Sequence, residues 1–104
     1  MPYTLGFPDK ELLAQHFDEH HIEFGVATED EYELLADTFL GGPLDDGALE
    51  CIRGSNGDVI RYNRLTDEFG VRGTDGFIRT YFKPNPIFHR QPTNLDYFRK
   101  ECNR

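Results

Sequence analysis

The stretch from Asp58 to Lys83, DVIRYNRLTDEFGVRGTDGFIRTYFK, decides the fold. Apolar and polar residues alternate along much of it, which is the period of a β-strand. Asn56-Gly57, just before the stretch, and Asp75-Gly76, inside it, tolerate the positive φ of tight hairpin turns. We therefore predict an antiparallel meander. Its four strands are expected at residues 49–53, 58–63, 68–72 and 77–83.

The residues before the strands predict a helix with defined ends. Thr28 and Glu31 have the spacing of a capping box. Apolar residues then recur at helical intervals until Gly41-Gly42-Pro43 ends the pattern. Residues 9–20 predict an earlier helix with a narrow apolar stripe.

After the strands, residues 85–93 predict a loop and residues 94–102 a short closing helix. The expected fold class is α+β, with two N-terminal helices packed on one face of a four-stranded antiparallel β-sheet and a short C-terminal helix. A chain of 104 residues is near the common size of one domain, so we expect a single domain over residues 1–104 and a monomer.

No stretch approaches the roughly 18 apolar residues that a membrane span needs, and the first ten residues lack a signal-peptide pattern. We expect no membrane segment in this domain. Met occurs at position 1 alone, which favours a domain cut from a longer protein. Cys51 and Cys102 are far apart in a chain without a signal, so we expect free thiols, with a disulfide between them as the alternative.

The net charge of −8 conceals two unlike halves. Residues 1–50 hold 13 acidic residues and one basic residue, Lys10, for a net charge of −12, whereas residues 51–104 hold six acidic and ten basic residues, for +4. An acidic chain is a poor partner for nucleic acid because phosphate binding depends on Lys and Arg. The second half, however, has the charge that such binding needs.

Alternation along the strands assigns side chains to the two faces of the predicted sheet. We expect one face to pack on the N-terminal helices, through Ile52, Ile60, Tyr62, Phe69, Val71, Ile78 and Phe82. We expect the opposite face to be open and basic, with Arg53, Arg61, Arg72, Arg79, Tyr81 and Lys83. A solvated sheet surface also needs charges, so this pattern is compatible both with an ordinary surface and with a binding site for a polyanion.

A histidine cluster lies in the first predicted helix, where His16, Glu19 and His20 match the zinc-protease string H-x-x-E-H. Three interpretations remain open: a zinc site, surface histidines of an amphipathic helix, and a histidine that acts as general acid or base. A chain of this length leaves little room for a third zinc ligand and a substrate cleft. We therefore expect no metal and no cofactor.

Metal-free RNA cleavage needs few groups. A base takes the proton of the ribose 2′-hydroxyl, cations stabilise the charge on phosphate, and an acid protonates the leaving oxygen. The first helix, the fourth strand and the tail with His89 together contain these residue types. The chain lacks a Gly-rich phosphate loop and the G-x-S-x-G, CxxC and EF-hand patterns.

Several strings together resemble a domain at the C-termini of bacterial polymorphic toxins of the contact-dependent inhibition and Rhs types. They are His16-Phe17 with His20 and Phe24-Gly25, residues 28–39, Glu68 to Val71, and residues 92–98. IRTYFKP, residues 78–84, is the most specific of them, and the likeness spans about residues 10 to 98. This group is similar to the barnase-, colicin- and RelE-like ribonuclease fold.

The resemblance implies an enzyme that cuts RNA, often tRNA, in the cytoplasm of a target bacterium. It also implies delivery as the C-terminal part of a larger secreted or cell-surface protein, and neutralisation by a cognate immunity protein. The implied catalytic residues are His16, His20, Arg79, Thr80 and Lys83. For RNA binding we expect Arg61, Arg72, Tyr81 and His89.

Two features conflict with a simple version of this site. Alternation turns Thr80 toward the core, while Arg79 and Lys83 point away, so either the strand has a bulge or Thr80 is structural. The histidines belong to a helix that is expected to pack behind the sheet, away from the open face. They can reach a site on that face only if they lie at a helix end beside the edge of the sheet.

Two other functions remain open. An acidic inhibitor or immunity-type protein would use the acidic first half as its binding surface. A non-enzymatic RNA-binding module would bind RNA through Arg61, Arg79 and Tyr81 and leave it intact.

Overall fold

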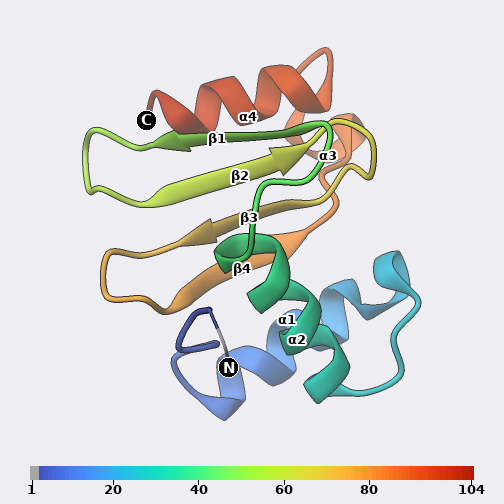
Figure 1. Ribbon diagram of the computed structural model, residues 1–104. Helices are drawn as coiled ribbons and strands as arrows, with labels where there is room; N and C mark the ends of the chain where they lie inside the picture. Colours follow the sequence, from blue (N-terminus) through green and yellow to red (C-terminus); the bar gives the residue numbers. More distant parts are fainter. Residues whose placement is uncertain (1–2) are drawn as a thin grey trace.

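Two helices, four strands and two further helices follow one another in the part of the chain that the structure describes (Figure 1). A computed structural model describes residues 3–104. The elements are α1 (Lys10–Phe24), α2 (Glu29–Gly41), β1 (Ala48–Ile52), β2 (Val59–Asn63), β3 (Phe69–Arg72), β4 (Ile78–Phe82), α3 (Pro86–His89) and α4 (Asn94–Cys102). The predicted α+β fold class is confirmed. The predicted loop at residues 85–93 contains one short helix, α3.

The sheet is the predicted antiparallel meander, in the order β1-β2-β3-β4. Gly57 and Gly76 have φ of 79° and 88° in the hairpin turns, a conformation that glycine adopts without steric cost. Val71 pairs with Thr80, but Arg72 pairs with Ile78. The shift leaves Arg79 as an extra residue in β4, so the strand does contain a bulge.

Side-chain caps define both N-terminal helices. Asp9 accepts a hydrogen bond from the Leu12 N–H at 2.7 Å, and Thr28 Oγ1 accepts one from the Glu31 N–H at 3.2 Å. The predicted cap at Thr28 is therefore confirmed, although the Glu31 carboxylate accepts from the Thr28 hydroxyl, at 3.0 Å, in place of the Thr28 N–H of a full capping box. Helix α1 continues one turn beyond its predicted end, because its chain reversal comes at Gly25, whose φ is 66°.

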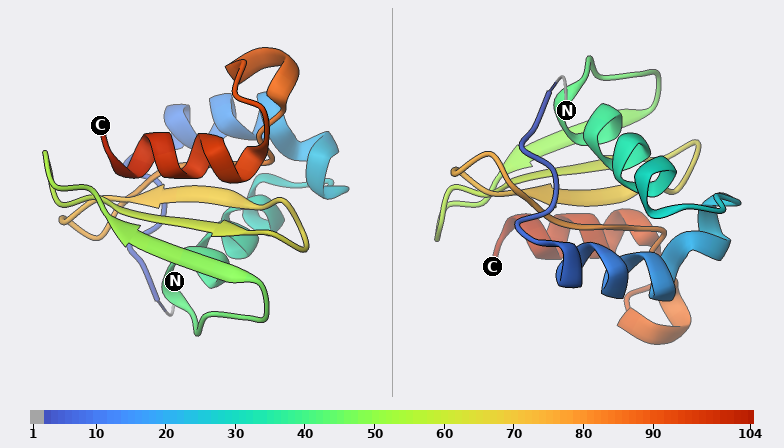
Figure 2. Two further views of the ribbon diagram at one scale, coloured as in Figure 1. Left: turned by 90° about the horizontal axis from the view of Figure 1, so that it is seen from above. Right: turned by 90° about the horizontal axis from the view of Figure 1, so that it is seen from below.

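The sheet is covered on both faces (Figure 2). Helix α2 packs on one face, α1 lies beside α2 and contacts β4, and α4 packs on the opposite face against β2. The expectation of an open basic face is therefore wrong. The face that carries Arg61, Gly70 and Tyr81 is the one under α2, and Ile60, Tyr62, Phe69 and Val71 pack with Phe98 of α4.

Two apolar cores result, one on each face. The core under α1 and α2 contains Tyr32, Leu40, Ile78 and Tyr81, and Tyr32 donates a hydrogen bond to the Tyr81 carbonyl. Four of the residues expected under the N-terminal helices, Ile60, Tyr62, Phe69 and Val71, therefore lie under α4 instead, whereas Ile78 does lie under the N-terminal helices. Ile52 is exposed at the end of the edge strand, and Ile78 lies in the α2-side core because of the bulge.

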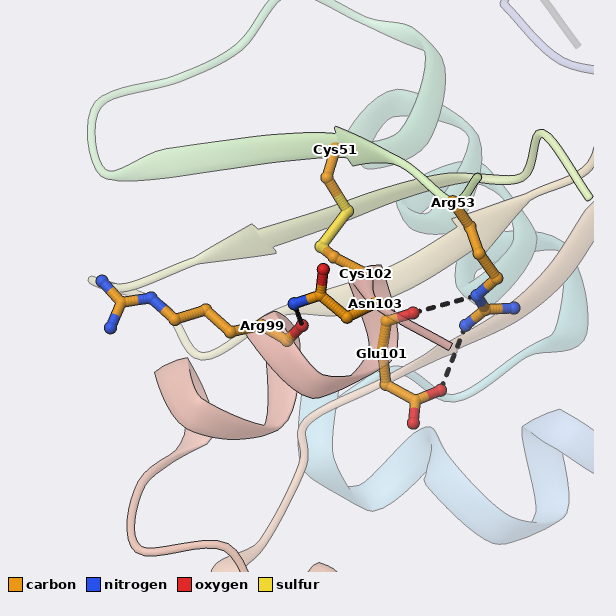
Figure 3. Close-up of a disulfide and its surroundings, with 6 residues drawn as sticks. All are labelled: Cys51, Arg53, Arg99, Glu101, Cys102 and Asn103. Atoms are coloured by element: carbon orange, nitrogen blue, oxygen red, sulfur yellow. Dashed lines mark hydrogen bonds and ion pairs between the residues drawn. A yellow bond between two sulfur atoms is a disulfide. The ribbon is translucent and has the colours of Figure 1, made fainter. Parts of the chain in front are cut away.

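A disulfide joins β1 to the end of α4 (Figure 3). Cys51 and Cys102, which we expected to be free, are bonded, with their Cα atoms 6.1 Å apart. Arg53 reinforces the junction, donating to the Glu101 carbonyl at 2.9 Å and to its carboxylate at 3.1 Å. The folded topology brings the two cysteines together although 51 residues separate them. Within residues 3–104, no helix is both long and apolar enough to cross a bilayer.

Candidate active site

A cavity of about 460 Å³ opens where α1, the end of β4, α3 and the start of α4 meet. Its lining residues are Glu19, His20 and Glu23 of α1, Phe82, Lys83 and Asn85 at the end of β4, Phe88 and His89 of α3, and Tyr97 of α4. It lies at the β4 edge of the sheet, where the histidines of the first helix were expected to reach a site.

His20 is the titratable group whose surroundings are most clearly suited to proton transfer. Its ring stacks on Phe82, with ring centroids 5.2 Å apart. Its Nδ1 lies 2.8 Å from Glu23 Oε2, and a carboxylate can only accept, so Nδ1 carries the hydrogen. Its Nε2 lies 3.5 Å from Glu19 Oε2. The contact with Glu23 places a hydrogen on Nδ1 and fixes the ring so that Nε2 faces Glu19.

Glu23 connects this histidine to the sheet. While Oε2 contacts His20, Oε1 accepts a hydrogen bond from the Lys83 backbone N–H at 2.7 Å. That N–H follows the last residue of an edge strand and would otherwise lack a partner from the sheet. One carboxylate therefore orients the imidazole and fixes the position of α1 relative to β4.

His89 is held in one neutral tautomer. Its Nδ1 accepts a hydrogen bond from the Gln91 N–H at 3.0 Å, so this nitrogen carries no proton. Its Nε2 then donates to Asn94 Oδ1 at 2.9 Å. Because both nitrogens are engaged, His89 is better suited to shape the cavity than to transfer protons.

A hydrogen-bond network supports His89 from behind. Asn94 Nδ2 and the Tyr62 hydroxyl both donate to Asp67 Oδ1, at 3.3 Å and 2.9 Å. Burial, with this bond to Asp67, raises the pKa of Tyr62 to about 12. The tyrosine therefore stays protonated and keeps its role as donor.

The cavity walls are largely aromatic. His89 stacks on Tyr97 with centroids 4.5 Å apart, and Tyr97 in turn contacts the edge of Phe82, which stacks on His20. Burial raises the pKa of Tyr97, so its hydroxyl remains neutral. Lys83 supplies a positive charge, and its Nζ lies 5.4 Å from the centroid of the Phe24 ring. Asn85 accepts a hydrogen bond from the Ile87 N–H and caps α3.

Three of the nine predicted site residues meet in this cavity: His20, Lys83 and His89. His16 does not line it. Its ring lies one helical turn away, 6.0 Å from the His20 ring, and contacts Phe7 at 5.2 Å. Its Nδ1 is buried and has no hydrogen-bond partner among residues 3–104. Burial, and secondarily His20, lowers the pKa of His16 below 6.5, against an opposite effect of Glu19.

Arg79 and Thr80 lie toward the other end of β4. Four residues of extended chain place Arg79 about 13 Å from Lys83 along the strand. Arg79 forms an exposed ion pair with Asp75 at 3.0 Å, over the Asp75-Gly76 turn. Thr80 pairs with Val71 and points to the α4 side of the sheet. Neither residue lines the cavity.

The arginines expected to bind RNA instead hold α2 to the sheet. Arg61 is 8% exposed and donates to Glu50 and to the carbonyls of Phe39 and Gly42, at 3.0, 2.9 and 2.6 Å. Arg72 donates to the Leu40 carbonyl at 2.9 Å. These carbonyls lie at the C-terminal end of α2, where no backbone N–H is available for them.

Tyr81, the ring expected to stack on a base, is fully buried. Its hydroxyl donates to Glu68, and burial together with that bond raises its pKa. The expectation that Arg61 and Tyr81 present an RNA-binding surface is therefore wrong in this structure. Their side chains stabilise the packing of α2 on the sheet.

Several residues of the cavity were not among the predicted site residues. Glu19 was part of the H-x-x-E-H string, and Glu23 lies three residues after His20, a spacing that makes contact on a helix. That spacing could have identified the pair of His20 and Glu23. Phe88 and Tyr97 gave no such local signal, because only the fold brings them to α1.

Among residues 3–104, no group of three or more His, Cys, Asp and Glu side chains is placed to hold a metal ion. His16, Glu19 and His20 lie close together, but the nitrogens of His20 face two carboxylates and His16 points into the core. A scan against protein-family models and a search of curated proteins both give no match to this chain.

Proposed function

We propose that this chain is a metal-independent endoribonuclease that acts at the α1–β4 cavity. The observation that carries the proposal is the arrangement of His20, which has Nδ1 on Glu23 and Nε2 near Glu19 in a cavity that also contains Lys83. The toxin-like strings of the sequence support the same activity. On that basis the biological role would be that of a toxin domain that cuts RNA, with tRNA as the leading substrate, and is neutralised by an immunity protein.

The residues of the cavity match the steps of RNA cleavage. The ribose 2′-oxygen attacks phosphorus as its proton passes to a base, and the bond from phosphorus to the 5′-oxygen breaks as an acid protonates that oxygen. An imidazole whose nitrogens each face a carboxylate can hold a proton on both, so we assign His20 the acid and Glu19 the base. Lys83 would stabilise the charge on phosphate. The products would be a 2′,3′-cyclic phosphate and a 5′-hydroxyl.

The cavity by itself is not strongly positive, because Glu19 and Glu23 offset Lys83. General affinity for RNA would have to come from other basic residues of the second half, such as the exposed Arg64, Arg90 and Arg99. The site itself would supply orientation and proton transfer.

The test measures cleavage of tRNA and of total RNA by purified protein in excess EDTA, together with the chemistry of the new ends. We expect cyclic phosphate ends. His20→Ala should lower the rate by about 10²- to 10⁴-fold and Lys83→Ala by about 10²- to 10³-fold. Arg79→Ala is the matched control, because Arg79 is a cation of the same strand that lies outside the cavity.

Thermal melting must accompany each rate, because a catalytic role requires lost cleavage with an unchanged melt. If Arg79→Ala or His16→Ala stops cleavage while His20→Ala does not, the cavity is not the site. Activity that disappears in chelator and returns with zinc would contradict the metal-free mechanism.

A second candidate, an acidic inhibitor or immunity-type protein, is favoured by one observation. Five acidic residues at the start of α2 and after it are exposed: Glu29, Asp30, Glu31, Asp45 and Asp46. Exposed acidic residues of this kind would attract a basic partner. Expression in bacteria separates the two candidates, because an active ribonuclease should stop growth and an inhibitor should not. A chain that binds RNA without cutting it would instead be an RNA-binding module.

A further inference from the structure

Helix α3 exposes two apolar side chains in succession, and only one of them faces the cavity. Ile87 is 80% exposed and Phe88 is 83% exposed. Phe88 lines the cavity, whereas Ile87 is not among its lining residues. A large aromatic ring left in water beside a cavity is a surface that a ligand can cover.

The backbone holds Phe88 in place at the mouth of the cavity. Asn85 caps α3 at its start, Pro86 is its first residue, and Arg90 ends it in a left-handed conformation with φ of 62°. The Gln91 N–H donates to His89 from the other side. The segment is therefore ordered before any ligand binds, which lowers the entropic cost of stacking on Phe88.

The cavity has the size and wall chemistry for one nucleotide unit. Its volume of about 460 Å³ falls within the range of about 300 to 1,000 Å³ for small-molecule sites. Two stacked aromatic pairs line it and offer apolar surface to a base. A base inside a duplex is stacked between its neighbours and paired with the opposite strand, so it could not enter the cavity.

We infer that Phe88 is a stacking platform for one unpaired nucleobase, so that the substrate class is single-stranded or loop RNA. This inference rests on the proposed ribonuclease function, because it places the base next to the phosphate that His20 and Lys83 would act on. Stacking on an exposed aromatic ring is independent of base identity. Phe88 would therefore select unpaired over paired RNA.

The test is fluorescence anisotropy with a labelled 2′-O-methyl RNA, which cannot be cleaved, as a single strand and annealed to its complement. Phe88→Ala should weaken binding of the single strand by about 5- to 150-fold, the range for loss of one base stack. Binding of the duplex should not change. Ile87→Ala, the matched control on the same helix, should bind the single strand like the wild type, and Phe88→Trp should preserve binding.

The melting temperatures of both alanine variants should match the wild type, because the side chains are exposed. Equal losses from Ile87→Ala and Phe88→Ala, or no loss from Phe88→Ala, would overturn the inference. Weaker binding by Phe88→Ala in a chain that cleaves no RNA would support the base site and refute the proposed function. Unchanged cleavage and unchanged RNA binding by Phe88→Ala would support the proposed function and refute the base site.

Discussion

The disulfide between Cys51 and Cys102 should account for a large share of the stability of the fold. It closes a loop of 51 residues, and a cross-link of that length removes loop entropy from the unfolded chain worth about 4 kcal/mol at 25 °C. The whole stability of a typical domain is about 5 to 15 kcal/mol. With an unfolding entropy of about 2.1 cal/mol/K per residue, the loss corresponds to a melting temperature lower by about 20 °C.

Thermal melting by circular dichroism, with a thiol count before each run, measures this effect. We expect the reduced wild type and the double variant Cys51→Ala with Cys102→Ala to melt about 20 °C below the oxidised wild type. The double variant should not respond to reductant, which separates the disulfide from other effects of the reagent. If oxidised and reduced wild type melt within about 3 °C of each other, the loop-closure reasoning fails for this chain.

Three further predictions concern buried polar side chains. Burial lowers the pKa of His16 below 6.5, so the unfolded chain binds a proton at His16 more readily than the folded chain does. The free energy of unfolding should therefore decrease as the pH falls through 6.5. His16→Leu should reduce that loss and, by removing an unpaired polar atom, raise stability by about 1 kcal/mol in urea melts. Arg61→Met should lower the free energy of unfolding by about 3 kcal/mol, because Glu50 and two carbonyls lose their donor. In a refolded sample the same variant should leave the salt dependence of RNA binding unchanged. Tyr81→Phe should lower the free energy of unfolding by about 1 to 3 kcal/mol, since Glu68 loses its hydroxyl partner. A reduced RNA affinity at equal stability would instead show that Tyr81 does contact RNA.

The strands and helix caps could be predicted because their causes are local. Asn56-Gly57 and Asp75-Gly76 form their turns through the φ preferences of their own residues, and Thr28 caps a helix three residues away. Alternation also grouped Ile60, Tyr62, Phe69 and Val71 on one face. What the alternation could not show was which helix covers which face, because both faces carry large apolar rings.

The candidate site could be predicted only in part for the same reason. His20 stood out in the sequence, but its neighbours Lys83 and His89 lie 63 and 69 residues further along the chain and reach it through the sheet and α3. Arg61 was wrongly predicted to bind RNA, because the alternation of a strand does not distinguish an exposed cation from one that binds the carbonyls of a helix end. The cysteines could not be paired before the position of α4 on β1 and β2 was known.

The double contact of Glu23 has a consequence for how related chains would change over time. One oxygen binds the side chain of His20, and the other binds a backbone N–H at position 83, which every residue except proline offers. The second contact does not depend on any activity. In a lineage that lost the proposed ribonuclease function, selection on His20 would end, while the sheet edge would still require an acceptor at position 23. We therefore expect inactive descendants to retain Glu23 after His20 has been replaced. The presence of both residues would then identify the homologues that remain active.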